Sequence, residues 1–463
     1  GDAGALVVRE MQKKAELVQT PVGFLDDDPM KQNQQIHAVP VIGTLDDLPR
    51  TLAVRSIDQV VIAIPSAPGR VIRQVAEACT KLNVPFRTMP GLYELIGGKV
   101  SVSRLREVEI ADLLRREPAL IDDHAIGGSL GGRRVLITGA GGSIGTELCR
   151  QVARWGPSAL ILLGHGENSI FETLLDLEDN FQSIPIHPVI ADIRDLDRLS
   201  IVFETLKPEV VFHAAAHKHV PLMELNVDES ITNNVLGTRN VVEVAITFGV
   251  ERLVMISSDK AIRPSSVMGA TKRLAELIVL DGARRSGLNY SVVRFGNVLG
   301  SRGSVIPRFK RQIAAGGPVT ITHPDMKRYF MTIPEAVHLV LQASSMGEGG
   351  EVFVLNMGEQ VRIFDLAEDL IRLSGLEPGK DIDIVFTGIR HGEKLSEDLW
   401  DKWANYEPTN HPDIVLLADE AIFSGDSLQR TIDELIHLER EGDSSSIVKL
   451  IDSYIPGAAV RST

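Results

Sequence analysis

The sequence predicts an α/β protein built on doubly wound parallel sheets, with two such domains in succession. Short apolar segments alternate with amphipathic helical segments along most of the chain, as they do when each strand returns to its sheet through a helix. A glycine-rich turn at 139–145 also separates one apolar strand from the helix that follows it. Together these observations favour parallel strands covered by helices on both faces.

The composition excludes several other classes. With 463 residues, 44% apolar and 24% charged, the chain has the make-up of a globular protein of two to four domains. Its apolar runs are far shorter than the ~18 residues typical of a membrane span. A net charge of −14 disfavours nucleic-acid binding, which depends on Lys and Arg contacts with phosphates. Two cysteines without a CxxC spacing disfavour a disulfide framework and fit a reducing compartment.

Residues 1–110 are predicted to form a smaller Rossmann-like domain. Its expected elements are helices over 5–17 and 70–82 and strands over 22–29, 37–43, 59–65 and 84–89. An acidic turn, Asp26 to Asp28, either contacts a ribose or has a structural role. The structural role is favoured because no complete glycine loop precedes the turn. A connector over 111–130, broken by Pro118 and a Gly-Gly-Ser stretch, leads to the next domain.

The chain begins Gly-Asp-Ala-Gly, without Met, and runs directly into a helical pattern. A glycine cluster in this position normally follows a strand, and here that first strand is missing. We therefore expect the sequence to be part of a longer protein, cut inside its first glycine loop.

Residues 131–430 are predicted to form the larger domain, a Rossmann-type sheet with a substrate lobe formed mainly by 294–400. The expected strands are 134–138, 158–163, 186–191, 210–213, 252–257 and 291–294. After residue 294 the regular alternation gives way to loops and short elements, which is typical of a substrate lobe. Residues 431–463 are expected to form a helical tail.

The glycine turn of this domain is the strongest signal for a dinucleotide. Gly139 permits the tight turn, Gly142 lets the backbone approach a pyrophosphate, and Gly145 allows close packing of helix and strand. Ser143 and Ile144 open the helix, whose amino end supplies N–H donors and a partial positive charge to phosphates. The alternative, a tight turn without a ligand, is disfavoured by this strand–turn–helix context.

Other cofactor contacts are expected at the ends of the next strands. A ribose-binding carboxylate normally ends the second strand, but Glu167 comes a few residues late, so NAD and NADP both remain open. Asp192, next to Ile193, either contacts the adenine or caps a helix. The remaining candidates for cofactor binding are Ala214, Ala215, Lys218, Asn234 and Lys272.

Three histidines stand at the end of the fourth strand of this domain: His213 is its last residue, and His217 and His219 follow it. Their spacing fits no common zinc site, and neither cysteine nor carboxylate accompanies them closely. The small residues between them are better explained by a cofactor lying against the backbone, so no metal is predicted.

A hydroxyl, a carboxylate and an amine stand together at the end of the fifth strand, as Ser258, Asp259 and Lys260. Met268 and Lys272 follow on one face of the next helix, four residues apart. An ordinary surface ion pair and a solvated lysine would explain single members of this set, but explain the set poorly. Doubly wound folds have their chemistry at this end of the strands.

These motifs resemble the extended short-chain dehydrogenases/reductases. Within them, 131 to about 400 is similar to the nucleotide-sugar 4,6-dehydratases of the CapD-type polysaccharide biosynthesis group. The likeness continues through Arg294-Phe-Gly-Asn297, the run from Arg302 to Pro307, the run from Thr322 to Phe330, and Gly388-Ile-Arg390-His-Gly-Glu393. The usual Tyr-x-x-x-Lys appears as Met268-x-x-x-Lys272, which resembles the long, membrane-anchored branch that acts on UDP-N-acetylglucosamine.

The resemblance implies a C5-retaining UDP-N-acetylglucosamine 4,6-dehydratase of bacterial polysaccharide or glycan biosynthesis. Such an enzyme oxidises C4, eliminates water across C5 and C6, and returns hydride to C6. Asp259 is then the acid at the C6 oxygen, Lys260 the base at C5, and Ser258 a hydrogen-bond donor to the C4 oxygen. Lys272 binds the nicotinamide ribose. Because Met268 cannot accept a proton, Asp259 or a water must take over the usual tyrosine step.

The implied substrate is a UDP-sugar. Its candidate ligands are Asn297, Arg302, Val305, Arg328, Arg390 and Glu393. The resemblance also implies a homo-oligomer and a parent protein at the cytoplasmic face of the inner membrane, anchored through segments outside this sequence. Two alternatives remain: a 4-epimerase of the same superfamily, and a non-catalytic nucleotide-sugar-binding scaffold.

Overall fold

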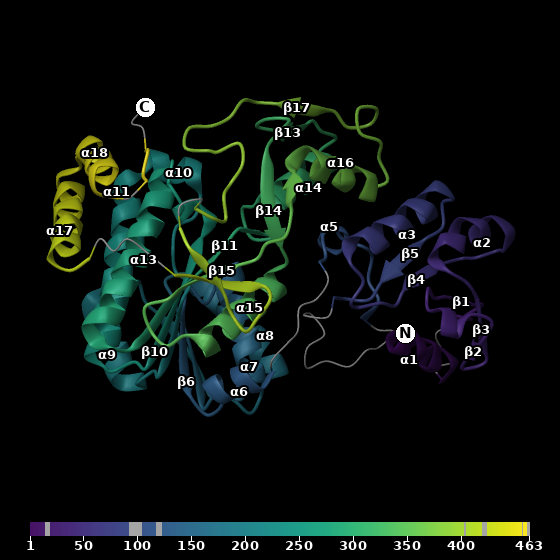
Figure 1. Cartoon of the computed structure of the whole chain (residues 1–463), viewed down its shortest axis with the longest axis horizontal. Coiled ribbons are helices and arrows are strands. Elements are labelled where there is room, and N and C mark those ends of the chain that lie inside the picture. The colour runs from purple at the N-terminus through teal and green to yellow at the C-terminus, as the bar shows by residue number, and fades with distance from the viewer. Residues whose placement is uncertain are drawn as a thin grey trace. The chain divides into compact units, whose positions relative to one another are not determined.

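A computed structural model describes residues 1–13, 19–91, 104–116, 123–401, 404–418, 424–455 and 457–460. The chain divides into two compact units, Gly1–Pro118 with Asp369–Leu376, and Ala119–Glu368 with Glu377–Thr463. Each unit contains parallel strands and helices, as the sequence predicts (Figure 1).

The first unit contains small sheets and amphipathic helices. Strand β1 pairs in parallel with β3, β2 pairs antiparallel with β3, and β4 pairs in parallel with β5. The bounds are α1 (Asp2–Lys13), β1 (Phe24–Leu25), β2 (Gln35–Ile36), β3 (Val39–Gly43), α2 (Leu48–Val54), β4 (Val60–Ile62), α3 (Gly69–Lys81), β5 (Phe86–Thr88) and α5 (Ile110–Leu113). The predicted end of the first helix, 14–17, lies outside the described residues.

The strand predicted over 37–43 begins two residues later than expected. His37 and Ala38 both have positive φ, 50° and 61°, and form the two-residue turn between β2 and β3. Two positive φ angles are the signature of a tight hairpin turn. The acidic turn before this hairpin is held internally: Asp26 accepts from Lys31, Asp27 from the Leu45 amide and Asp28 from the Met30 amide. These contacts fit the structural role.

The second unit is built on one nine-stranded sheet in the order β18-β19-β15-β11-β10-β9-β6-β7-β8. All pairs from β15 to β8 are parallel, and β19 and β18 close the other edge antiparallel. The strands are β6 (Arg134–Thr138), β7 (Ala159–Gly164), β8 (Ile186–Ile190), β9 (Val210–His213), β10 (Arg252–Ser258), β11 (Asn289–Phe295), β15 (Val352–Leu355), β18 (Tyr406–Pro408) and β19 (Ile414–Leu417). The six strands expected from the sequence are therefore six of the seven parallel strands of this sheet, with β8 at its edge.

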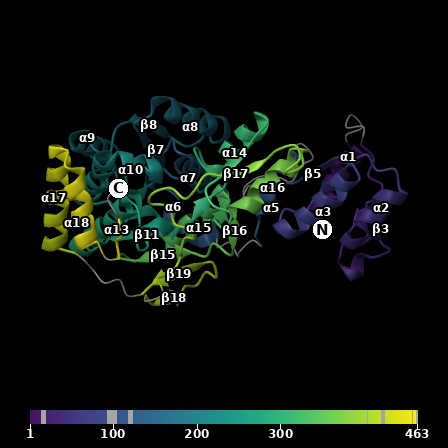
Figure 2. The same ribbon diagram turned by 90° about the horizontal axis from the view of Figure 1, so that it is seen from above.

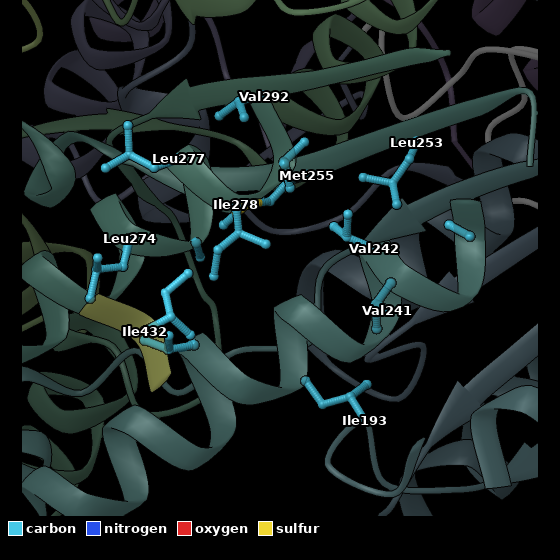
Figure 3. Close-up of a cluster of buried hydrophobic side chains, with 14 of the residues drawn as sticks. Ile193, Val241, Val242, Leu253, Met255, Leu274, Leu277, Ile278, Val292 and Ile432 are labelled. Atoms are coloured by element: carbon cyan, nitrogen blue, oxygen red, sulfur yellow. The ribbon is translucent and has the colours of Figure 1, made fainter. Parts of the chain in front are cut away.

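Helices cover both faces of this sheet because successive strand residues point to opposite sides. Leu136, Leu253 and Met255 pack on one face, and Val135 and Val254 on the other. One layer comprises α9 (Leu196–Leu206), α12 (Gly237–Thr247), α13 (Val267–Ser286), α17 (Asp426–Glu441) and α18 (Ser444–Tyr454). The other comprises α6 (Asp123–Leu130), α7 (Ser143–Arg154), α8 (Glu167–Asn180) and α15 (Ile333–Met346). Figure 3 shows side chains of β10, α12 and α13 meeting in the first layer.

The structure differs from the sequence-based expectation at both flanks of the large domain. Part of the predicted connector is helix α6, whose Ile126 and Leu130 are fully buried in the core of the second unit. Residues 117–122 of that connector lie outside the described residues. Helices α17 and α18 are no separate tail, because Ile432 and Ile451 are buried in the same core as α13 (Figure 1, Figure 2). In α6, burial of the apolar face outweighs the low helix propensity of its glycines.

Shorter elements fill the predicted lobe. They are β12 (Asn297–Val298), α14 (Val305–Ala314), β13 (Val319–Ile321), β14 (Lys327–Met331), β16 (Gln360–Arg362), α16 (Ile363–Leu373) and β17 (Ile384–Phe386), with α10 (Val220–Leu225), α11 (Val227–Ser230) and the π-helical η5 (Ile231–Leu236) preceding α12. Across the described part of the chain, no helix is both long and apolar enough to cross a membrane.

Candidate functional site

The strand order creates a crevice in the middle of the sheet. In chain order β6 to β11 are the first to the sixth strands of the unit, and they lie in the order 3-2-1-4-5-6. The order reverses between β6 and β9, and ligands of such sheets bind outside the carboxyl ends of the strands at this point. The glycine turn follows β6, and the predicted cofactor residues Ala214 and Ala215 follow β9.

The glycine turn has room for backbone but none for side chains. Gly139 has a φ of 66°, and a Cβ at residue 139 would lie 2.8 Å from the Ala215 nitrogen. A Cβ at residue 145 would lie 2.1 Å from the carbonyl oxygen of Gly139. Gly142 is the N-cap of α7, without a side chain to cap the first amides of the helix. These residues fit the pyrophosphate of a dinucleotide, which would accept from those amides.

A cavity of about 280 Å³ extends from this turn along the strand ends. Its walls come from the glycine turn, the ends of β7 and β8, the segment after β9, and one arginine from the lobe. The lining residues used below are Gly139, Gly142, His165, Asp192, Ile193, Ala214, Ala215, His217 and Arg302. Of the predicted cofactor residues, five besides Gly139 therefore meet in one crevice. Ile144 is partly buried and packs against the core.

Arg302 lies in this crevice, although the resemblance implied a contact with the substrate. Its backbone N–H donates to the Ser143 Oγ at 3.1 Å, and its guanidinium donates to the Gly141 carbonyl. The lobe is thereby joined to the glycine turn. Asn234, on η5, holds the segment after β9: its Oδ1 accepts from the His217 amide at 2.8 Å, and its Nδ2 donates to the His217 carbonyl.

Of the two carboxylates predicted to contact the cofactor, only Asp192 lines the crevice. Glu167 is exposed, opens α8 and is not among the described residues that line the cavity. Asp192 lines it, but accepts from the Arg194 guanidinium at 2.7 Å. The hydrogen bond to Arg194 outweighs partial burial and lowers the pKa of Asp192. The cap of α9 is Asp195, so the predicted capping alternative for Asp192 does not apply.

Two of the three histidines, His213 and His217, have separate partners. His213 is buried between the hydroxyls of Thr138 and Thr238, at 2.8 and 3.0 Å, and burial lowers its pKa to about 3. His217 contacts Glu229 at 3.1 Å. Within the described ranges, no group of three or more His, Cys, Asp or Glu side chains is arranged to hold a metal ion.

A second cavity, of about 170 Å³, lies beside Lys260. Four cations face it: Lys218, Lys260, Arg328 and Lys394. Lys218 was predicted to bind the cofactor, but it lines this second cavity and donates to the Ser301 Oγ at 3.3 Å. A cationic pocket suits an anionic ligand in a protein of net negative charge.

Asp259 and Lys260 form a close pair at the end of β10. The Lys260 Nζ donates to the Asp259 Oδ1 at 2.9 Å and to the Asn297 Oδ1 at 3.0 Å. The Ser258 Oγ also donates to the Asp259 Oδ1, at 2.8 Å. The other oxygen of Asp259, Oδ2, is buried without a hydrogen-bond partner. Asp259 is fully buried, while Lys260 reaches the cavity wall.

Met268 and Lys272 are buried in α13, below the strand end. The Lys272 Nζ donates to the Ile256 carbonyl at 2.6 Å. Desolvation by burial lowers the pKa of Lys272 to about 8, with Glu276 acting in the opposite direction. Met268 has 2% of its surface exposed, so it fills space in the core.

Of the six predicted substrate residues, two line the second cavity. Glu393 and Arg328 line the second cavity, and Arg328 is anchored by donating to the Lys327, Lys394 and Leu395 carbonyls. Asn297 reaches the site through Lys260. Arg390 is exposed, and Val305 begins α14; neither is among the residues lining the cavity.

One carboxylate of this cavity was missed by sequence reasoning. Glu397 is 4% exposed, and its Oε1 lies 3.9 Å from the Lys260 Nζ. The only sequence signal is its spacing of three from Lys394, a weak indication of an ion pair. The contact with Lys260 joins distant parts of the chain and is decided by the fold.

Comparisons with known proteins agree with this architecture. The sequence profile of the polysaccharide biosynthesis protein family matches residues 135–419, and that of the CoA-binding domain matches residues 1–90. The capsular polysaccharide biosynthesis protein CapD of Staphylococcus aureus is 49% identical over 405 residues, which are 87% of this chain and 67% of that protein.

Two further relatives carry enzyme names. A Campylobacter jejuni UDP-N-acetylglucosamine 4,6-dehydratase (inverting) is 34% identical over 64% of this chain and 88% of its own length. A UDP-glucose 4-epimerase of Rickettsia canadensis is 43% identical over 41% of this chain and 55% of its own length.

Among solved structures, Pen from Bacillus thuringiensis has a TM-score of 0.58 and 32% identity, covering 67% of this chain and 98% of Pen. DesIV from Streptomyces venezuelae, a dTDP-glucose 4,6-dehydratase with NAD and TYD bound, has a TM-score of 0.52 and 21% identity, covering 57% and 87%. At that identity DesIV supports the fold alone. The family match over most of the chain and the CapD similarity carry the assignment. The chain therefore belongs to the polysaccharide biosynthesis protein family, in the superfamily of nucleotide-sugar dehydratases and epimerases.

Proposed function

We propose that this chain is a UDP-N-acetylglucosamine 4,6-dehydratase that retains the configuration at C5. The observation that carries the proposal is the Asp259–Lys260 pair: a buried carboxyl and an amine, 2.9 Å apart, with the amine at the wall of a cationic cavity. An elimination needs one group to remove a proton and another to protonate the leaving oxygen. An epimerisation at C4 needs no acid at C6.

The proposed cofactor is NAD, with NADP as the alternative, bound by the glycine turn and the crevice after β9. When bound, it would supply reversible oxidation at C4, with the C4 hydroxyl proton passing to a water, and the resulting ketone would make the C5 proton acidic. Ser143 and the first amides of α7 would hold its pyrophosphate, with Arg302 beside them. Lys272 and Ser258 would orient the nicotinamide ribose and the C4 oxygen.

In the elimination, Lys260 would take the C5 proton while Asp259 would deliver to the C6 hydroxyl the proton that its Oδ1 has received from Lys260, and the hydroxyl leaves as water as the C5–C6 double bond forms. Burial lowers the proton affinity of Lys260, but the charges of Asp259 and Glu397 outweigh burial, so its pKa is raised. Lys260 must therefore lose a proton before it acts. Transfer of that proton along the 2.9 Å hydrogen bond to Asp259 creates the base and the acid in one step. A substrate that desolvates the pair favours this neutral form.

Retention at C5 follows if Lys260 returns its proton to the face from which it was taken. The cations of the second cavity would bind UDP; of the predicted substrate residues, Arg328 and Glu393 line this cavity. Homo-oligomerisation and attachment to a membrane through segments outside this sequence belong to the same proposal, as implied by the family resemblance.

The test is to incubate the purified chain with UDP-N-acetylglucosamine and a catalytic amount of NAD, and to analyse the product by mass spectrometry and NMR. A product lighter by one water, with a 4-keto group, a C6 methyl and the original C5 configuration, is expected. The same product with inverted C5 would refute retention only. An isobaric product would identify a 4-epimerase, the candidate favoured by the Rickettsia relative. Unchanged substrate that nevertheless binds would identify a scaffold, the candidate favoured by Met268.

A further inference from the structure

Glu397 is the buried carboxylate of the substrate cavity that the proposed reaction does not use. Its two carboxylate oxygens lie between two amines, with Oε1 3.9 Å from the Lys260 Nζ and Oε2 3.9 Å from the Lys394 Nζ. The Oε2 atom is buried and has no hydrogen-bond partner. A buried carboxylate oxygen without a hydrogen bond is costly, so its retention here calls for an explanation.

The backbone around Glu397 is held from two sides. The Gln360 side chain donates to the Glu397 carbonyl at 2.6 Å, and the Arg328 guanidinium donates to the Lys394 and Leu395 carbonyls. The Lys394 Nζ donates to the Ile262 carbonyl at 2.9 Å. The carboxylate therefore projects from an anchored segment, and its distance from Lys260 is set by the fold.

Charged groups from several segments surround the Lys260 amine, and within the described part of the chain Glu397 is one of the two carboxylates that pair with it. Asp259 faces it on its own segment, and Glu397 faces it from the segment after β17. Arg328 faces it as a like charge that lowers the pKa of Lys260, and Lys260 in turn lowers the pKa of Lys218. Without Glu397, Lys260 would keep Asp259 as its single ion-pair partner among the described residues, while Lys218, Arg328 and Lys394 also line the cavity.

We propose that Glu397 is a positioning residue for Lys260: its buried carboxylate keeps the amine at the cavity wall, and in its ammonium form, until a substrate enters. The inference rests on the proposed function for the role of Lys260 in turnover, but not for the contact itself. A substrate that pairs with Lys260 and Lys394 weakens the interaction between Glu397 and the Lys260 ammonium. The proton can then pass from Lys260 to Asp259. Glu397 thereby couples filling of the cavity to the start of the elimination.

The test uses the full chain and three variants. Glu397→Gln removes the charge and keeps the size, and Glu397→Asp keeps the charge on a shorter arm. Asp398→Asn is the matched control, because it removes the adjacent carboxylate, which pairs with Arg263. The first readout needs no activity: the rate at which acetic anhydride acetylates Lys260 is measured against pH by mass spectrometry. The second is the pH dependence of kcat and KM for UDP-N-acetylglucosamine.

In Glu397→Gln, the midpoint of Lys260 acetylation is expected to move to lower pH, because the ammonium has lost a neighbouring negative charge. The acid limb of kcat should move in the same direction. The maximal kcat should nevertheless fall at least about tenfold, with a smaller change in KM, because the Lys260 amine is no longer held at the cavity wall. Glu397→Asp should keep the midpoint close to that of the wild type, with a partial loss of kcat. Asp398→Asn should match the wild type in both readouts.

An acetylation midpoint that is the same in Glu397→Gln and in the wild type would overturn the inference, whatever happens to activity. If Glu397→Gln does not fold, an unchanged profile in Glu397→Asp together with unchanged kcat would overturn it instead. A shifted midpoint in a chain that dehydrates no UDP-sugar would uphold the Lys260 contact and refute the proposed function. The two failures are therefore distinguishable.

Discussion

The Cβ position of residue 145 lies 2.1 Å from the carbonyl oxygen of Gly139, where no side-chain atom fits. The obstacle is backbone, so Gly145→Ala must move the glycine turn or the start of α7. We expect at least about a tenfold loss of NAD affinity and a lower melting temperature, since loss of the turn also misdirects the first amides of α7. Isothermal titration with NAD and thermal unfolding measure the two effects.

The matched control is Gly128→Ala, in the middle of α6, where an added Cβ has open space. Alanine is the better helix former there, so this variant should be more stable than the wild type by about 0.5–1 kcal/mol and should bind NAD normally. NAD binding by Gly145→Ala at wild-type affinity would contradict the role given to the glycine turn.

Arg302→Ala tests whether Arg302 serves the cofactor crevice or the substrate. Because its guanidinium contacts the Gly141 carbonyl and its backbone contacts Ser143, we expect the Kd for NAD to rise by roughly tenfold, with a smaller change for UDP. Fluorescence titrations with each ligand give the two constants. Arg311→Ala, an exposed change on α14, is the control and should alter neither. A larger effect on UDP than on NAD would return Arg302 to the substrate site.

Asp259→Asn tests the division of labour in the proposed elimination. Asparagine keeps the size but cannot deliver the proton, so kcat for dehydration should fall by at least about 100-fold while UDP affinity stays near that of the wild type. Without the Asp259 charge, which raises the pKa of Lys260, the amine can release its proton to solvent and remove the C5 proton, so NMR in D₂O should detect deuterium entering C5 of the substrate without loss of water. Full activity in this variant would exclude Asp259 as the acid.

The lowered pKa of Lys272 predicts that the free energy of unfolding increases as pH rises. Its pKa of about 8 lies below the ~10.4 of a free lysine, so the folded protein binds fewer protons than the unfolded chain between these values. The free energy of unfolding should therefore gain from this residue as pH rises from about 8 to about 10.4, by at most ~3 kcal/mol. Below pH 8 the full cost of the buried charge is present.

Urea unfolding of the wild type and of Lys272→Met at pH 7, 8, 9 and 10 measures this contribution as the difference between the two proteins. The free energy of unfolding of Lys272→Met minus that of the wild type should fall as pH rises, because only the wild type carries the buried amine and gains stability when that amine loses its proton. Lys380→Met, at an exposed lysine paired with Glu377, should follow the wild type throughout. Parallel curves for Lys272→Met and the wild type would contradict the lowered pKa.

Local features of the molecule were predictable because short stretches of chain carry them. The strands over 134–138 and 210–213 occur with the bounds expected, since apolar runs between turn residues are local signals. The roles of Gly139 and Gly145 also follow from one strand–turn–helix unit. The helix within the predicted connector was missed because burial of Ile126 and Leu130, which depends on the rest of the unit, outweighs the weak helix propensity of Gly127 and Gly128.

By itself, the sequence determined the fold class, the family resemblance and the presence of Asp259 and Lys260 at a strand end. Only the tertiary structure decided which residues share a cavity: it brings Lys218 to the cavity beside Lys260, Arg302 to the glycine turn, and Glu397 to within 3.9 Å of the Lys260 amine. The physical reason is that neighbours along a strand or helix are set by local backbone geometry. Neighbours across a cavity are set by the order in which parallel strands pack, which no single segment encodes.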